Sequence, residues 1–145
     1  MSEKIKALFV QVHKLPELLE IENSENAFKN VINTSNVEFF PYFDDVHLIL
    51  DDSMQSNKEF NRSLKKAGNI DEIIKGNFII AGLDYKSGGV ISLTEQQIQK
   101  YEKIFKVPEF LLVVDNKLKA YPDLKYLQKE MNNNTYHKKC WAFLR

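Results

Sequence analysis

Cys140 and His137 come nearest to catalytic chemistry, because a thiol attacks as its thiolate and a nearby imidazole can accept the proton. Cys140 is the only cysteine in the chain. Residues three apart in an extended strand point to opposite faces, and a single cysteine beside Trp141 is typical of core filling. We therefore expect no catalytic residues and no enzymatic activity.

Two pairs of adjacent aspartates, Asp44-Asp45 and Asp51-Asp52, offer the carboxylate oxygens that hard cations prefer. Neighbouring side chains of an extended chain point apart, and neither pair has the glycine-punctuated spacing of an EF-hand loop. The three histidines and the single cysteine are scattered, whereas a structural zinc site needs about four such ligands. The sequence therefore predicts no metal site.

Two glycine turns, 75–77 and 88–90, are the candidates for a phosphate-binding loop. Neither has the spacing of a P-loop or of a dinucleotide-binding fingerprint. We expect both to be turns of the backbone, and we expect no cofactor.

The charges cancel overall, with 20 basic and 20 acidic residues, but they are unevenly distributed. A neutral chain lacks the positive field of proteins that bind nucleic acid mainly through phosphates, so we do not expect nucleic acid as a partner. The segment 37–57 contains acidic residues and no lysine or arginine. Its aspartates are either a recognition surface for a partner protein or charges that keep a hairpin soluble. The candidate partner-binding residues are Asp44, Asp45, Asp51 and Asp52.

The apolar stretches of the chain, such as 78–83 and 110–114, are far shorter than the roughly 20 residues that cross a bilayer. The first residues lead directly into a strand-like run, without the apolar segment of a secretory signal. A single cysteine suits a reducing compartment. We expect a cytoplasmic protein with no membrane contact.

The elements that must position these residues are mostly strands. Apolar and β-favouring residues predict strands at 5–12, 18–21, 73–83 and 90–92, and hairpins over 37–51 and 110–121. Pro41 cannot donate a ladder hydrogen bond, which places its strand at an edge or at a bulge.

Helices are predicted where capping residues precede an apolar stripe. One begins at Asn23 or Ser24, and a second runs from Thr94, which forms a capping box with Gln97, to about Phe105. A third helix starts at Pro122, and residues 136–144 supply a closing strand.

The sequence thus predicts a single α+β domain with a mixed or mainly antiparallel sheet and about three helices packed on it. Residues 1–109 form its core, and residues 110–145 form a C-terminal extension on the same domain. The segment 52–70 is polar and contains little periodicity, so we expect a loop that carries function.

Several of these segments together resemble the domain of unknown function 3846 family, found among Firmicutes and their phages and conjugative elements. The resemblance spans about residues 5–109 and implies an accessory protein of a mobile element, without attaching an activity. It is carried by the segments 21–24 leading to Ala27, 61–64, 73–82, and 92–94 with the helix that ends in Tyr101 and Phe105.

Within the matching region Asn61, Arg62 and Ser63 are the candidate ligand-binding residues. A guanidinium can hold a carboxylate or phosphate with two parallel hydrogen bonds, and Asn61 could orient it. The alternatives are that Arg62 pairs with a nearby acid or that Asn61 caps a short helix.

Three functions follow as hypotheses. The leading one is a non-enzymatic phage or mobile-element protein that binds a host protein, for example as a counter-defence inhibitor. The second is a protein that sequesters a small anion or nucleotide with the Asn61-Arg62 loop. The third is a nucleic-acid-associated accessory protein, and the oligomeric state is left open.

Overall fold

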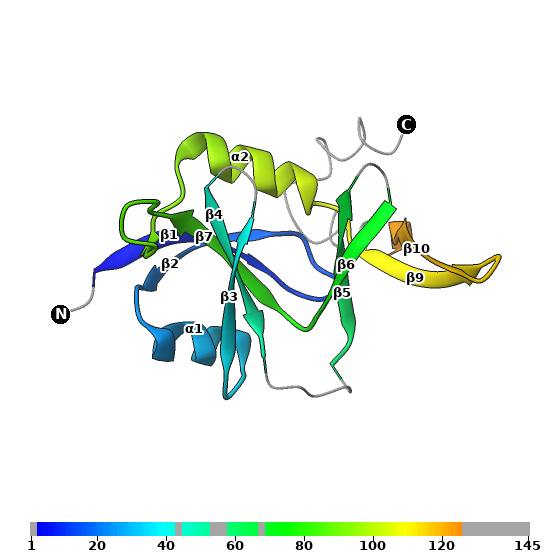
Figure 1. Cartoon of the computed structure of the whole chain (residues 1–145), viewed down its shortest axis with the longest axis horizontal. Helices are drawn as coiled ribbons and strands as arrows, with labels where there is room; N and C mark the ends of the chain where they lie inside the picture. Colours follow the sequence, from blue (N-terminus) through cyan, green and yellow to red (C-terminus); the bar gives the residue numbers. More distant parts are fainter. Residues whose placement is uncertain (1–2, 43–44, 53–57, 67–68, 126–145) are drawn as a thin grey trace.

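The centre of the molecule is a six-stranded antiparallel sheet with the strand order β2-β1-β7-β4-β3 and with β8 paired to β7 (Figure 1). The computed structural model describes residues 3–42, 45–52, 58–66 and 69–125. The elements of this central region are β1 (Lys4–Val10), β2 (Glu17–Glu22), α1 (Glu25–Ile32), β3 (Val37–Tyr42), β4 (Val46–Asp51), β7 (Phe78–Leu83), β8 (Val90–Ile91) and α2 (Glu95–Ile104).

Two further antiparallel hairpins complete the described chain. The first pairs β5 (Phe60–Lys66) with β6 (Asn69–Lys75), and the second pairs β9 (Glu109–Val114) with β10 (Lys117–Pro122). In Figure 1 the β9–β10 hairpin extends away from the central sheet, beyond the β5–β6 hairpin.

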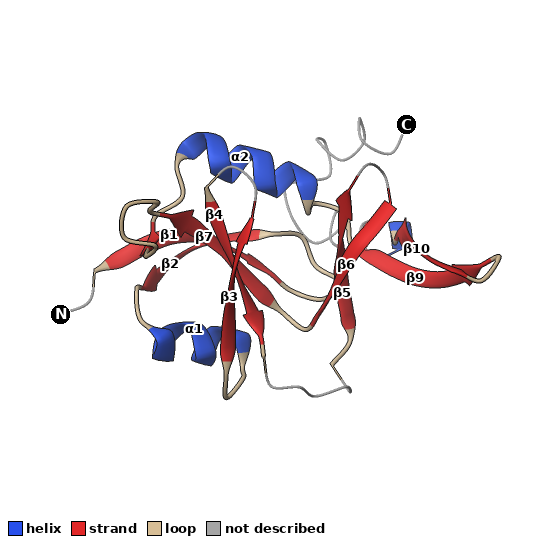
Figure 2. Ribbon diagram, viewed as in Figure 1, coloured by secondary structure: helices blue, strands red, loops and turns tan. Residues whose placement is uncertain are grey.

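Both faces of the central sheet are covered, because successive strand residues point to opposite sides. On one face Leu8, Leu48 and Ile80 pack with α2 and with the β5–β6 hairpin. On the other face Ile49 and Ile79 pack with α1. Figure 2 shows the two helices on opposite sides of the sheet.

Local sequence explains where both helices begin. The Ser24 hydroxyl accepts from the backbone N–H of Ala27, and α1 ends at Asn33 in the left-handed conformation. Thr94 and Gln97 form the complete capping box that the sequence predicts. The early strands, the 37–51 hairpin with an edge strand at Pro41, and the 110–121 hairpin are likewise confirmed.

The predicted α+β class with about three helices is wrong. The described residues form ten strands and two helices, so the protein is mainly β. Most of the helix predicted from Pro122, and the closing strand at 136–144, lie outside the described residues.

Part of the error lies in the segment 52–70, which was expected to be a loop. Its second half is the strand β5. Polar residues at buried positions hide the alternating pattern that normally identifies a strand.

The predicted strand 73–83 is also not one strand. Gly76 adopts a positive φ of 77°, which glycine tolerates because it has no Cβ, and the chain turns there. As a result, β6 pairs with β5 in the separate hairpin, while β7 occupies the middle of the central sheet.

Candidate functional site

The residues predicted to bind a ligand, Asn61, Arg62 and Ser63, lie on β5 and are buried. Arg62 is 1% exposed and is among the largest fully buried side chains in the described chain. The prediction that these residues lie on a loop is therefore wrong. The structure brings the three residues together, but inside the protein.

The guanidinium of Arg62 donates to main-chain oxygens of three separate segments. Its Nε donates to the Phe105 oxygen at 3.1 Å, and its Nη2 donates to the Lys14 oxygen at 2.6 Å. Its Nη1 donates to the Asn61 main-chain oxygen and to Oδ1 of the same residue, the latter at 2.7 Å. Arg62 thus joins β5 to the turn after β1 and to the end of α2.

The charge of Arg62 is kept despite its burial. Desolvation lowers its pKa to about 10, and the carboxylate of Glu109 opposes this effect. At neutral pH the guanidinium is therefore still protonated and can donate all of its hydrogen bonds. Neither alternative of the sequence analysis describes its role, because Arg62 bonds mainly to carbonyl groups and Asn61 lies in a strand.

Asn61 and Ser63 complete this buried polar cluster. The Asn61 amide donates to the main-chain oxygens of Val10 at 3.0 Å and Gly76 at 2.9 Å. Buried polar groups cost free energy unless they are paired, and here each of these donors has a partner. An external anion would have to displace main-chain acceptors to reach the cluster, so its geometry serves the fold.

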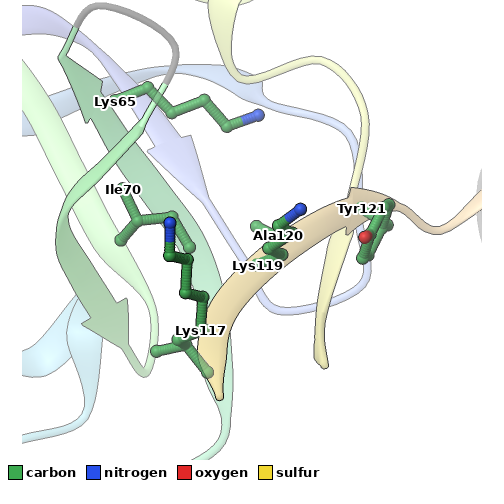
Figure 3. Close-up of a pocket in the computed structure, with 7 residues that line it drawn as sticks. Lys65, Ile70, Lys117, Lys119, Ala120 and Tyr121 are labelled. Atoms are coloured by element: carbon green, nitrogen blue, oxygen red, sulfur yellow. The ribbon is translucent and has the colours of Figure 1, made fainter. Parts of the chain in front are cut away.

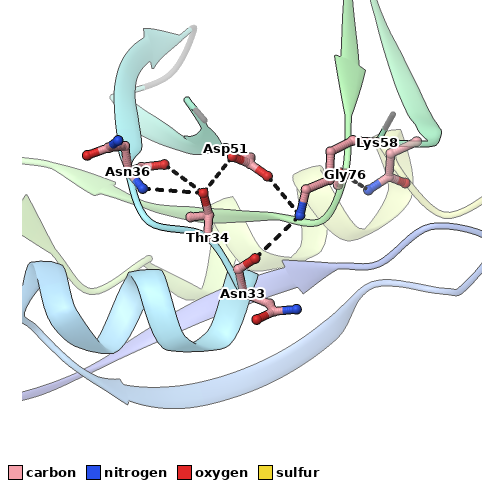
Figure 4. Close-up of polar contacts among 7 residues, drawn as sticks. Asn33, Thr34, Asn36, Asp51, Lys58 and Gly76 are labelled. Carbon is pink, nitrogen blue, oxygen red and sulfur yellow. Dashed lines mark hydrogen bonds and ion pairs between the residues drawn. The ribbon is translucent and has the colours of Figure 1, made fainter. Parts of the chain in front are cut away.

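The predicted acidic surface is not a single patch. The Asp51 side chain is only 3% exposed, and it accepts from the Thr34 hydroxyl at 2.6 Å and pairs with Lys58 at 3.1 Å (Figure 4). Asp45 and Asp52 are exposed, but they flank opposite ends of β4. Asp44 lies outside the described residues.

The most conspicuous exposed surface is the β9–β10 hairpin, to which the sequence analysis assigned no function. Val113 is 71% exposed and Leu112 is 48% exposed. Other large apolar side chains exposed in this region are Phe110, Leu118 and Leu124. An apolar run normally indicates a buried strand, so the exposure of β9 could not be predicted from its sequence.

The hairpin register defines the composition of one of its faces. Phe110 lies opposite Tyr121, with ring centroids 5.9 Å apart, and Leu112 lies opposite Lys119. Cross-strand partners share a face, so this face combines aromatic, aliphatic and cationic groups. The tip turns through Asp115, which has a positive φ, and through the following asparagine, as two-residue hairpin loops require.

The family of the chain is shown by a match that covers about its first two thirds. A family model described as a domain of unknown function, DUF3846, matches residues 5–106. The chain belongs to the DUF3846 family. The predicted resemblance is therefore confirmed, and the match contains the Arg62 cluster but ends before β9. No curated protein and no solved structure matches this DUF3846 protein.

Within residues 3–42, 45–52, 58–66 and 69–125, no three His, Cys, Asp or Glu side chains gather as a potential metal site. No helix in the same ranges is long and apolar enough to cross a membrane.

Proposed function

We propose that this DUF3846 protein is a non-enzymatic, cytoplasmic binding protein that contacts a partner protein through the β9–β10 hairpin. The observation that carries the proposal is the concentration of exposed apolar side chains on this hairpin, led by Leu112 and Val113. Phe110 and Leu112 project from one face of the hairpin and Val113 and Leu118 from the other, so both faces expose apolar surface of the kind that is characteristic of interaction sites.

The composition of the hairpin indicates what the partner surface offers. The Phe110–Tyr121 ring pair provides rigid aromatic area of the kind that dominates interface energies. Lys117 and Lys119 lie beside it. The complementary surface is therefore apolar at its centre and carries carboxylates at its edge, since opposite charges across an interface guide and orient association.

The resemblance to accessory proteins of mobile elements supplies the biological setting of the proposal. A mobile-element protein that binds and blocks a host protein, as a counter-defence inhibitor does, needs an exposed recognition surface and no reaction centre. The hairpin can serve as that surface because its Leu112 and Val113 side chains are exposed, while its first residue, Glu109, is held by Ser63 and Lys65 of β5.

The test is affinity purification from a Firmicutes host lysate, followed by binding measurements with the purified partner. We expect the double variant Leu112→Ser/Val113→Ser to lose partner binding by at least tenfold, because both side chains are exposed and the fold does not need them. The matched control is Leu18→Ser, an equally exposed leucine on the edge strand β2, which should bind normally.

A further arm tests the acidic residues. Neutralising Asp45 and Asp52 together should leave binding unchanged if the hairpin is the recognition surface. A different result would place the interface on the β3–β4 hairpin. In that case the Leu112/Val113 variant would bind like wild type, and the Asp45/Asp52 variant would lose binding. Recovery of no stoichiometric partner would contradict the proposed function itself.

A further inference from the structure

A pocket of about 430 Å³ lies between the β5–β6 hairpin and β10, next to the proposed partner surface, with which it shares Lys117, Lys119 and Tyr121 (Figure 3). The described residues that line it come from both hairpins and include no carboxylate. They are Lys65, Ile70, Lys117, Leu118, Lys119, Ala120 and Tyr121.

The pocket is cationic because three lysines from two hairpins meet around it. Lys117 and Lys119 are exposed residues of β10, and Lys65 reaches it from β5. Figure 3 shows the three side chains arranged around one opening. Lys65 is partly neutralised by its ion pair with Glu109 at 3.2 Å, so the other two lysines provide most of the unopposed charge.

The walls of the pocket are apolar or aromatic. Ile70 and Leu118 provide aliphatic surface, and Tyr121 provides a ring. Ligand pockets typically measure roughly 300–1,000 Å³ and combine such walls with a few charged groups. Lysine ammonium groups recognise phosphate as point charges, and an aromatic ring can stack on a base.

We propose that this pocket binds a small phosphorylated ligand of the nucleoside di- or triphosphate class. The phosphates lie against Lys117 and Lys119, and the base or sugar lies against Tyr121 and the aliphatic wall. This pocket, and not the buried Asn61 and Arg62 of β5, is the proposed site for a small anion. The pocket shares its two β10 lysines and Tyr121 with the proposed partner surface, but Leu112 and Val113 are not among the residues that line it, so the two sites can be tested separately.

Isothermal titration calorimetry with ATP, ADP, AMP and inorganic triphosphate tests the site on the full chain. We expect saturable binding that strengthens with phosphate number and weakens as salt is raised, because the attraction is ionic and screened. Lys117→Glu/Lys119→Glu should weaken ATP binding at least tenfold. Lys86→Glu/Lys103→Glu, which makes the same charge change at exposed positions elsewhere, should not change it.

The remaining outcomes separate the ligand sources. Tighter binding of ATP than of inorganic triphosphate supports a nucleotide with its base held by Tyr121, whereas equal binding supports the phosphate chain alone. The proposal is overturned if no probe binds at millimolar concentration, if the Lys117/Lys119 variant binds ATP like wild type, or if a short oligonucleotide binds far more tightly than any mononucleotide. Since Leu112→Ser/Val113→Ser leaves the pocket lining intact, failure of this site and failure of partner binding are distinguishable.

Discussion

Ser63 donates two hydrogen bonds to a single oxygen of Glu109, from its backbone N–H at 2.8 Å and from its hydroxyl at 2.9 Å. The other oxygen of Glu109 pairs with Lys65. Glu109 is the first residue of β9, and Ser63 and Lys65 lie on β5. One carboxylate thus attaches the exposed hairpin to the body of the family domain.

Glu109→Ala should lower the free energy of unfolding by about 2–3 kcal/mol, because it leaves both Ser63 donors without an acceptor in a part-buried position. Glu109→Gln should cost about 1 kcal/mol, since its amide oxygen still accepts from Ser63, while the ion pair with the half-exposed Lys65 and the carboxylate charge near Arg62 are lost. Urea unfolding measures both values. Equal losses for the two variants would show that the charge, and not the acceptor, holds the hairpin.

Arg62→Lys should destabilise the protein by about 1–3 kcal/mol even though it preserves the charge. An ammonium group lacks the planar fork that reaches the Phe105 and Lys14 oxygens together, so at least one buried acceptor is left unpaired. Thermal and urea unfolding provide the measurement, with the exposed Lys103→Ala as a control expected within about 0.5 kcal/mol. A fully stable Arg62→Lys would contradict the structural role of the guanidinium.

Asp51 and Asp52 should respond differently to the same substitution. Asp51→Asn weakens the buried contacts with Thr34 and Lys58 and should cost about 1–3 kcal/mol of unfolding free energy. Asp52→Asn changes an exposed side chain and should lie within about 0.5 kcal/mol of wild type. Chemical unfolding of the two purified variants distinguishes these cases, and similar values would place both carboxylates in solvent.

Tyr101 should make the protein less stable at alkaline pH. The side chain is completely buried, and desolvation, followed by the nearby Tyr42 and Asp45, raises its pKa from 10.0 to about 12. Between these pH values the unfolded phenol releases its proton while the folded one keeps it. Stability attributable to this group is therefore unchanged below pH 10 and falls as pH rises toward 12.

Comparison with Tyr101→Phe isolates this effect. The difference in unfolding free energy between wild type and variant should shift by about 2–3 kcal/mol between pH 9 and pH 12, in favour of the variant at high pH. Arg62 acts in the opposite direction over the same range, because its pKa is lowered, but it is present in both proteins and cancels. Parallel stability curves would show that the phenol ionises as readily in the folded state.

The sequence by itself determined the elements whose signals are local. Thr94 and Gln97 are close enough along the chain to form a capping box wherever the helix packs. Two apolar runs that flank a short polar turn likewise predict the hairpin over 110–121. The resemblance to the DUF3846 family also rests on short segments, among them 61–64 and 73–82, and the family model confirms it over residues 5–106.

Only the tertiary structure decided the roles of the polar and exposed residues. The sequence pattern predicts that Arg62 is a ligand-binding residue of a loop. Its true acceptors, the main-chain oxygens of Lys14 and Phe105, are distant in sequence and become its neighbours only on folding. The apolar run of β9 is typical of a buried strand, yet Val113 is exposed because no described element packs over it. Burial and hydrogen-bond pairing depend on contacts between distant segments, so local composition could not assign either one.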